Sequence, residues 1–133
     1  MPSRSKAFPL DPTKSVIPVE VLLEGPRGQL LLHMALDTGA TYTIVPVGAL
    51  QAIGYEPAAS PARIEFFAAA SVERRPVITV RAASAFGIRI ARLPVVCHDL
   101  PPRSPVRGLL GLNFLKQIRL HLDFPRRRLS VSR

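Results

Sequence analysis

The chain has 133 residues, of which 47% are hydrophobic, and this is enough for one domain with a substantial apolar core. Its net charge of +9 is mostly scattered, without a recognition helix or an aromatic stacking surface, which argues against nucleic-acid binding. No apolar run approaches the ~20 residues of a membrane span, and Cys97 is the only cysteine, which excludes an internal disulfide.

Residues 1–14 contain three prolines and are expected to form an irregular N-terminal arm, followed by a single domain over residues 15–133. The arm has no apolar stretch typical of a signal peptide, so we expect a cytoplasmic protein. His33, His98 and His121 are far apart in the sequence, and no His/Cys cluster has metal-ligand spacing. Neither a metal nor another cofactor is therefore expected.

The domain is expected to begin with a β-hairpin. Residues 15–23 are rich in β-branched and aliphatic side chains, residues 25–28 have the composition of a turn, and the apolar run 29–36 returns. After a loop, residues 43–45 predict a short buried strand that ends at Pro46.

The loop between these strands contains Asp37-Thr38-Gly39-Ala40. A carboxylate at the end of a buried strand is costly to desolvate and needs hydrogen-bond donors nearby. Gly39 lets the backbone turn sharply and approach that carboxylate, and Thr38 adds a hydroxyl. The pattern predicts that Asp37 lies at the bottom of a cleft, although an Asp-Thr-Gly tripeptide taken alone is more often an ordinary polar turn.

The second half of the chain predicts further short strands. Residues 62–67 and 72–81 are expected to form a hairpin joined through Ala68, Ala69, Ala70 and Ser71, and another hairpin is expected over residues 86–97. Residues 47–53 predict one or two helical turns, and Asn113 is expected to cap a helix over residues 114–118.

A Pro-rich loop, residues 98–107, leads into the apolar stretch Gly108-Leu109-Leu110-Gly111. Near the C-terminus, residues 120–122 and 129–131 alternate as strands around a turn at residues 124–127. The sum of about nine short strands and two short helices predicts a mostly-β single domain.

Two of these motifs together resemble a known family. Asp37-Thr38-Gly39-Ala40 is similar to the catalytic triplet, with its following small residue, of the retropepsin-like aspartic proteases, single-lobe relatives of pepsin. Leu109-Leu110-Gly111 is similar to their second signature, two hydrophobic residues and a glycine before the C-terminal helix. About seventy residues separate the motifs, as such a lobe requires.

The resemblance implies a closed acid-protease barrel of one lobe, with a flap hairpin and one short C-terminal helix. It implies an aspartic endopeptidase that hydrolyses peptide bonds of a peptide or protein substrate with a water activated between two aspartates. The chain contains one such triplet, so the second aspartate must come from a second copy, in a homodimer. The alternative is a catalytically silent lobe of the same fold that serves as a dimerisation or peptide-binding module.

Site roles also follow from the resemblance. Asp37 would be catalytic, and Thr38, Gly39 and Ala40 would form the active-site loop and contact the partner copy. Residues 68–71 would form the flap tip that covers the substrate, and residues 109–111 would support the loop from behind.

The chain also departs from retroviral members of the family. These have an acid two positions after the catalytic glycine and an Arg right after the second-motif glycine, where this chain has Thr41 and Leu112. Because both members of that ion pair are replaced, no unpaired buried charge remains. The sequence therefore resembles cellular or bacterial members. Residues 119–131 are expected to form a hairpin whose inward Leu and Val side chains lie near the dimer axis.

Overall fold

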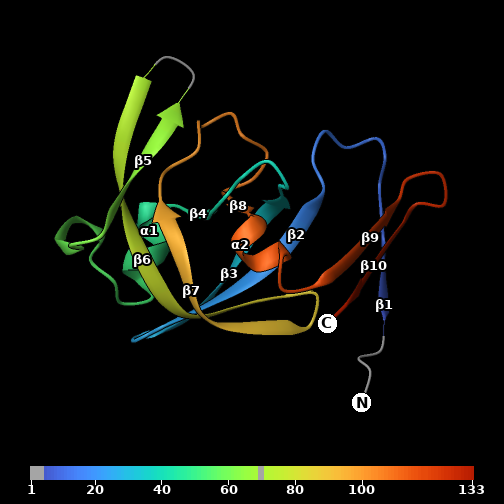
Figure 1. Ribbon diagram of the computed structural model, residues 1–133, viewed down its shortest axis with the longest axis horizontal. Coiled ribbons are helices and arrows are strands. Elements are labelled where there is room, and N and C mark those ends of the chain that lie inside the picture. Colours follow the sequence, from blue (N-terminus) through green and yellow to red (C-terminus); the bar gives the residue numbers. More distant parts are fainter. Residues whose placement is uncertain (1–4, 69–70) are drawn as a thin grey trace.

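The fold is a closed β-barrel, seen in the computed structural model, which describes residues 5–68 and 71–133 (Figure 1). Six strands pair in the order β2, β3, β8, β4, β7 and β6, and β6 pairs again with β2 to close the ring. The barrel strands are β2 (Pro18–Gly25), β3 (Gly28–Leu36), β4 (Thr43–Val45), β6 (Ser71–Ala85), β7 (Ile88–Cys97) and β8 (Gly108–Leu110). The predicted mostly-β, closed single-lobe fold is thereby confirmed.

The barrel encloses an aliphatic core. Side chains alternate between the interior and the surface along β2, where Val19, Val21 and Leu23 are buried and Glu20 is exposed. This alternation is the signature of a strand with one face against a core. The side chains that are fully buried are mostly Leu, Ile and Val, with Phe114 and Met34 as the largest exceptions.

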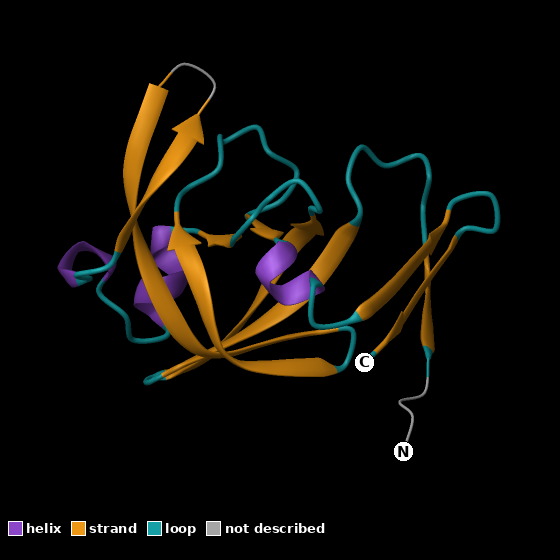
Figure 2. Ribbon diagram, viewed as in Figure 1, coloured by secondary structure: helices purple, strands orange, loops and turns teal. Residues whose placement is uncertain are grey.

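A long hairpin projects from the barrel (Figures 1 and 2). Strand β5 (Arg63–Ala68) pairs only with the first part of β6, and the two strands meet where Ala68 pairs with Ser71. The hairpin is where the sequence predicted it. Of its expected tip, Ala69 and Ala70 lie outside the described residues.

The expected boundary between β6 and β7 is wrong. Strand β6 does not end at Arg81 but continues to Ala85, and β7 passes unbroken through Pro94. The turn between them is Phe86-Gly87, and both residues have positive φ, 56° and 76°, as a tight hairpin turn requires. Phenylalanine is rare in this conformation, so Phe86 was assigned to a strand and Gly87 was not recognised as part of a turn. The Phe86 ring packs against Phe8, with centroids 5.3 Å apart.

A second, smaller sheet lies beside the barrel. It contains β1 (Lys6–Pro9), β10 (Arg128–Ser132) and β9 (Arg119–Asp123), in that order. The predicted β9–β10 hairpin is confirmed. The expectation of an irregular arm is wrong for residues 6–9, which pair with β10, about 120 residues away in the sequence. A strand whose partner is so distant has no local signal.

Three short helices complete the fold: α1 (Val47–Ala52), the 3-10 helix η1 (Pro57–Ala59) and α2 (Leu112–Leu115). Helix α2 starts two residues earlier than expected, with Gly111 rather than Asn113 at its N-cap. The Asn113 side chain bonds strand residues instead. Among the helices of the described segments, none is long and apolar enough to cross a membrane.

Candidate active site

The backbone around Asp37 orients its carboxylate. Asp37 follows the last residue of β3, and its N–H donates a hydrogen bond to the carbonyl of Leu110 at 3.0 Å. The Gly39 N–H donates to Asp37 Oδ1 at 2.8 Å, and a Cβ at Gly39 would come within 3.1 Å of that oxygen. The carboxylate is half-buried and is held by its own loop, as the sequence predicted.

The second motif supports this loop from below. Strand β8 lies between β3 and β4, with Leu109 opposite both Ala35 and Ile44. A Cβ at Gly111 would lie 2.5 Å from the carbonyl oxygen of Tyr42 and 2.8 Å from that of Ala40. Only glycine permits this approach, and it lets the Leu112 N–H donate to the Ala40 carbonyl at 2.8 Å. The two predicted motifs are therefore in direct contact.

A buried polar cluster that the sequence analysis missed joins the same segments. Thr43 is fully buried, and both its N–H and its hydroxyl donate to Asn113 Oδ1 at 2.9 Å. The Thr43 hydroxyl also accepts from the Gly111 N–H at 3.1 Å. Asn113 Nδ2 donates to the Pro94 carbonyl of β7. These bonds tie β4, β7 and the α2 turn into one unit beneath the Asp37 loop.

Asp37 borders a hollow of about 480 Å³ that faces the β5–β6 hairpin. One wall comes from the Asp37 loop and the segment after it, and the opposite wall comes from β5 through Ile64 and Glu65. The remaining walls are mostly apolar. The described residues that line it are Asp37, Gly39, Ala40, Thr41, Tyr42, Ile44, Ile64, Glu65, Val96 and Leu109.

A second hollow, of about 450 Å³, touches Asp37 from another direction. It is formed with residues 11–12, residues 14–17 and Phe124, which follows β9 and is 48% exposed. Asp37 thus lies between two open spaces, one toward the projecting hairpin and one toward the smaller sheet. Phe124 is thus an exposed apolar side chain on the same hollow as Asp37.

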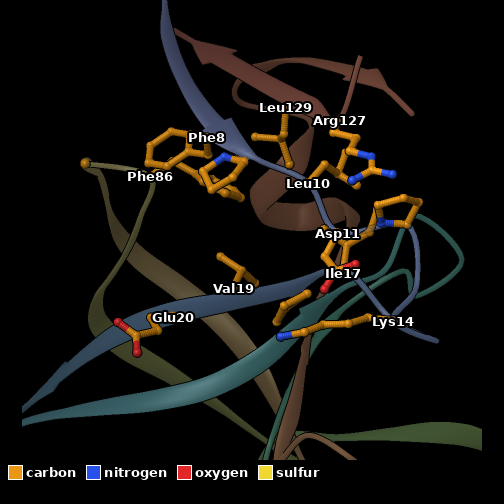
Figure 3. A pocket seen from close by; sticks show the side chains of 14 residues that line it. Phe8, Leu10, Asp11, Lys14, Ile17, Val19, Glu20, Phe86, Arg127 and Leu129 are labelled. Carbon is orange, nitrogen blue, oxygen red and sulfur yellow. The ribbon is translucent and has the colours of Figure 1, made fainter. Parts of the chain in front are cut away.

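A larger hollow, about 750 Å³, does not include Asp37 (Figure 3). It lies between β2 and the β1–β10 pair, and its walls include Phe8, Val19 and Leu129. None of the predicted site residues with described side chains, 37–40, 71 and 109–111, lines it. Size alone would therefore point to the wrong place for chemistry that depends on Asp37.

The other aspartates are held locally. Asp11 Oδ1 accepts hydrogen bonds from the backbone N–H and the hydroxyl of Thr13. Both bonds lower the pKa of Asp11, and the bond from the hydroxyl has the larger effect. Asp99 accepts from the Val47 N–H, and Asp123 accepts from the Arg126 N–H. Within the described part of the chain, no other carboxylate makes a hydrogen bond to Asp37.

The structure brings together residues 37–40 and 109–111, whereas Ala69 and Ala70 of the predicted flap tip lie outside the described residues. Thr38 is exposed, and its hydroxyl makes no hydrogen bond within residues 5–68 and 71–133. Ala68 pairs with Ser71 at the far end of the hairpin. In the described part of that hairpin, the residues that line the Asp37 hollow are Ile64 and Glu65. Cys97 is buried in β7, and burial is the main cause that raises the pKa of its thiol.

Comparison with known proteins agrees with this arrangement. A family model described as gag-polyprotein putative aspartyl protease matches residues 27–117, which include both motifs. Among solved structures, the chain is similar to a retropepsin-like aspartic protease from Rickettsia conorii, with a TM-score of 0.74 and 13% identity. That match covers 98% of this chain and 91% of the other, and at such low identity it shows the fold alone. No curated protein matches the sequence.

Proposed function

This chain belongs to the gag-polyprotein putative aspartyl protease family, and on that basis we propose that it is an aspartic endopeptidase active as a homodimer. The observation that carries the proposal is the Asp37 carboxylate, oriented by the Gly39 N–H at the edge of an open hollow with mostly apolar walls. Such a hollow suits an extended peptide whose side chains enter apolar subsites.

The chemistry requires two carboxylates at close range. Two unit charges about 4 Å apart repel by ~4 kcal/mol at an effective dielectric near 20, which corresponds to about three pKa units. The second ionisation of the pair is therefore suppressed, and one proton is shared. The ionised Asp37 acts as general base on a water, and the protonated Asp37 donates to the carbonyl oxygen of the scissile bond.

A second copy is the source of the second carboxylate. The other aspartates described above are engaged by nearby backbone groups, and the chain contains one Asp-Thr-Gly triplet. A twofold axis beside Asp37 would place two identical loops face to face. The unbonded Thr38 hydroxyl is then free to bond the partner's loop, and Gly39 can offer its backbone to the substrate.

The exposed Phe124, which lines a hollow with Asp37, supports a contact with the second copy on the side of Asp37 that faces the smaller sheet. The expectation that inward Leu and Val side chains of β10 lie near the axis stays a prediction, and Leu129 and Val131, 3% and 2% exposed in the single chain, would lie there without offering contact surface. They belong to the core of their own subunit. The features that this hairpin can offer a partner are the exposed Phe124 ring and the outer edge of β9, which among the described strands pairs only with β10.

The alternative is a silent lobe of the same fold that dimerises or binds peptides without cleaving them. Digestion of a mixed peptide library by the wild type and by Asp37→Asn separates the two. We expect the wild type to cleave, and Asp37→Asn to retain the fold and dimer but less than a few per cent of the activity. Asp99→Asn is the matched control, because the new amide can still accept from Val47 and lies outside the cleft. Residual cleavage by Asp37→Asn above that level would contradict the assignment.

A further inference from the structure

The hollow between Asp37 and β5 is acidic in a strongly basic protein. The chain has a net charge of +9, yet the described residues that line this hollow include two carboxylates, Asp37 and Glu65, and no Lys or Arg. We propose that the cleft selects peptides carrying a Lys or Arg side chain near the scissile bond, and that this side chain binds between Glu65 and the ring of Tyr42. This inference rests on the proposed protease function where it concerns cleavage, but not where it concerns peptide binding.

Glu65 is available for such a contact. It lies on β5 directly opposite Arg74 of β6, a placement that would ordinarily produce a cross-strand ion pair. Glu65 and Arg74 do not form an ion pair with each other. Arg74 instead lines a different hollow, together with Arg63 and Arg75. Arg75 is committed to Glu73 of its own strand. The Glu65 carboxylate therefore has no cation within ion-pair distance among residues 5–68 and 71–133.

Tyr42 supplies the other side of the site. It follows the Asp37 loop directly, its carbonyl is fixed against Gly111, and its half-buried side chain lines the same hollow as Glu65. A cation over an aromatic face is attracted by the ring, and a carboxylate nearby adds to that attraction. The apolar side chains Ile44 and Ile64 also line the hollow and suit the methylene stem of a Lys or Arg.

Dimerisation strengthens the effect. In the proposed homodimer, the two copies would contribute two Glu65 carboxylates, and the Asp37 pair would carry one shared negative charge. A cleft lined by one sign of charge concentrates ligands of the opposite sign. A basic protein with this local field would bind cationic peptides in the cleft while its remaining surface repels them.

The cleavage arm of the test uses peptides that differ at one position at a time from P4 to P4′, with Lys, Arg, norleucine, Gln or Glu. We expect kcat/KM for the Lys and Arg peptides to exceed that of the Gln peptide by about three- to tenfold at one position or more, as exposed charge pairs reinforced by a ring allow. Glu65→Gln should abolish the preference, and Glu65→Lys should reverse it toward Glu. Raising the salt concentration from 0.05 to 0.5 M should shrink it.

Matched variants isolate the two side chains. Glu20→Gln removes an exposed carboxylate of β2 outside the cleft, so it should leave the preference unchanged. Tyr42→Phe keeps the ring and should retain the preference, whereas Tyr42→Leu should reduce it. A wild type without any basic preference, or a preference that survives in Glu65→Gln, would overturn the inference.

A binding arm separates this inference from the proposed function. Fluorescence anisotropy measures the same labelled peptides on Asp37→Asn, alone and combined with Glu65→Gln. We expect the Lys and Arg peptides to bind Asp37→Asn more tightly than the Gln peptide, and Glu65→Gln to remove the difference. If no variant cleaves any peptide but this difference is present, the protease proposal fails and the inference stands; if cleavage occurs without it, only the inference fails.

Discussion

Thr43 and Asn113 determine how firmly the Asp37 loop is supported. The fully buried Thr43 hydroxyl satisfies both Asn113 Oδ1 and the Gly111 N–H. Thr43→Val keeps the shape but leaves the Gly111 N–H without its acceptor, so we expect the free energy of unfolding to fall by about 1–3 kcal/mol. Activity should fall as well, because Gly111 packs against the carbonyls of Ala40 and Tyr42.

Urea denaturation of Thr43→Val and Thr43→Ser, each compared with the wild type, measures the change in the free energy of unfolding. The serine keeps the hydroxyl and loses only a methyl group, which costs about 0.8 kcal/mol of burial. The larger loss should therefore belong to the valine variant. Equal losses in the two variants would show that the methyl contact, rather than the hydrogen bonds, carries the stability.

Among the site residues, the sequence alone identifies those whose residue type is required by the backbone geometry. Asp37, Gly39 and Gly111 were recognisable because an acid between apolar strands and a glycine after an apolar pair are unusual. The Thr43–Asn113 bond was not, since its partners are 70 residues apart and either residue could equally occupy a turn or helix cap. Glu65 was missed because nothing local distinguishes it from other exposed strand residues.

Among the secondary-structure elements, those with local patterns were predicted and those with distant partners were not. The β2–β3 hairpin has alternating residues and a Gly-rich turn, and it forms where expected. Strand β1 is stabilised by β10, and the last part of β6 is stabilised by pairing of Ser84 with Leu22 of β2. Small residues such as Ala82 and Ala83 have little β propensity, but they are fully buried where the barrel closes.

The hairpin β9–β10 carries a prediction about assembly. Phe124, at its turn, is 48% exposed and lines a hollow with Asp37. Phe124→Ser should change the free energy of unfolding of the single subunit by less than ~0.5 kcal/mol, because an exposed side chain is replaced. It should raise the dimer dissociation constant by about tenfold or more, as loss of a central interface aromatic does. Sedimentation velocity over a concentration series measures this, and activity should fall in parallel.

Leu31→Ser is the matched control for Phe124→Ser. Leu31 is 56% exposed on β3 and lines neither hollow that touches Asp37. It should leave both the dimer and the activity unchanged. Truncation after Phe124 is a poorer test, because it removes Leu129 and Val131 from the core of the same subunit. A Phe124→Ser protein that remains as dimeric as the wild type would place the interface elsewhere.

For the whole molecule, the shared proton of the Asp37 pair predicts how activity depends on pH. Activity requires one proton on the pair, so kcat/KM should peak on the acid side of neutral and decline as the second proton leaves. The apparent pKa values would belong to the pair rather than to either residue. A pH series of kcat/KM with an uncharged peptide measures this, and an optimum near pH 9 would contradict the mechanism.

The stability of the fold should set the acid limit of this range. Burial is the largest cause that lowers the pKa of His98, and Arg75 lowers it further, while Glu73 and Asp99 act in the opposite direction. The unfolded chain therefore takes up a proton near pH 6.5, before the folded chain does. Below that pH the unfolded state binds more protons, so the free energy of unfolding should fall as pH drops from about 7 through the folded pKa of His98.

Urea denaturation at pH 7.5, 6.5 and 5.5 and a fixed protein concentration measures this decline, since dimer formation would otherwise shift the midpoint. His98→Gln removes the titrating group and should flatten the curve over this interval. His33→Gln, at an exposed position on β3, should keep the wild-type slope. At lower pH a further loss should follow in all variants, because the Arg89 hydrogen bond lowers the pKa of Glu24 in the folded state and this stabilisation disappears as Glu24 is protonated. An unchanged slope in His98→Gln would show that His98 does not limit stability, and the acid limit of activity would then belong to the Asp37 pair itself.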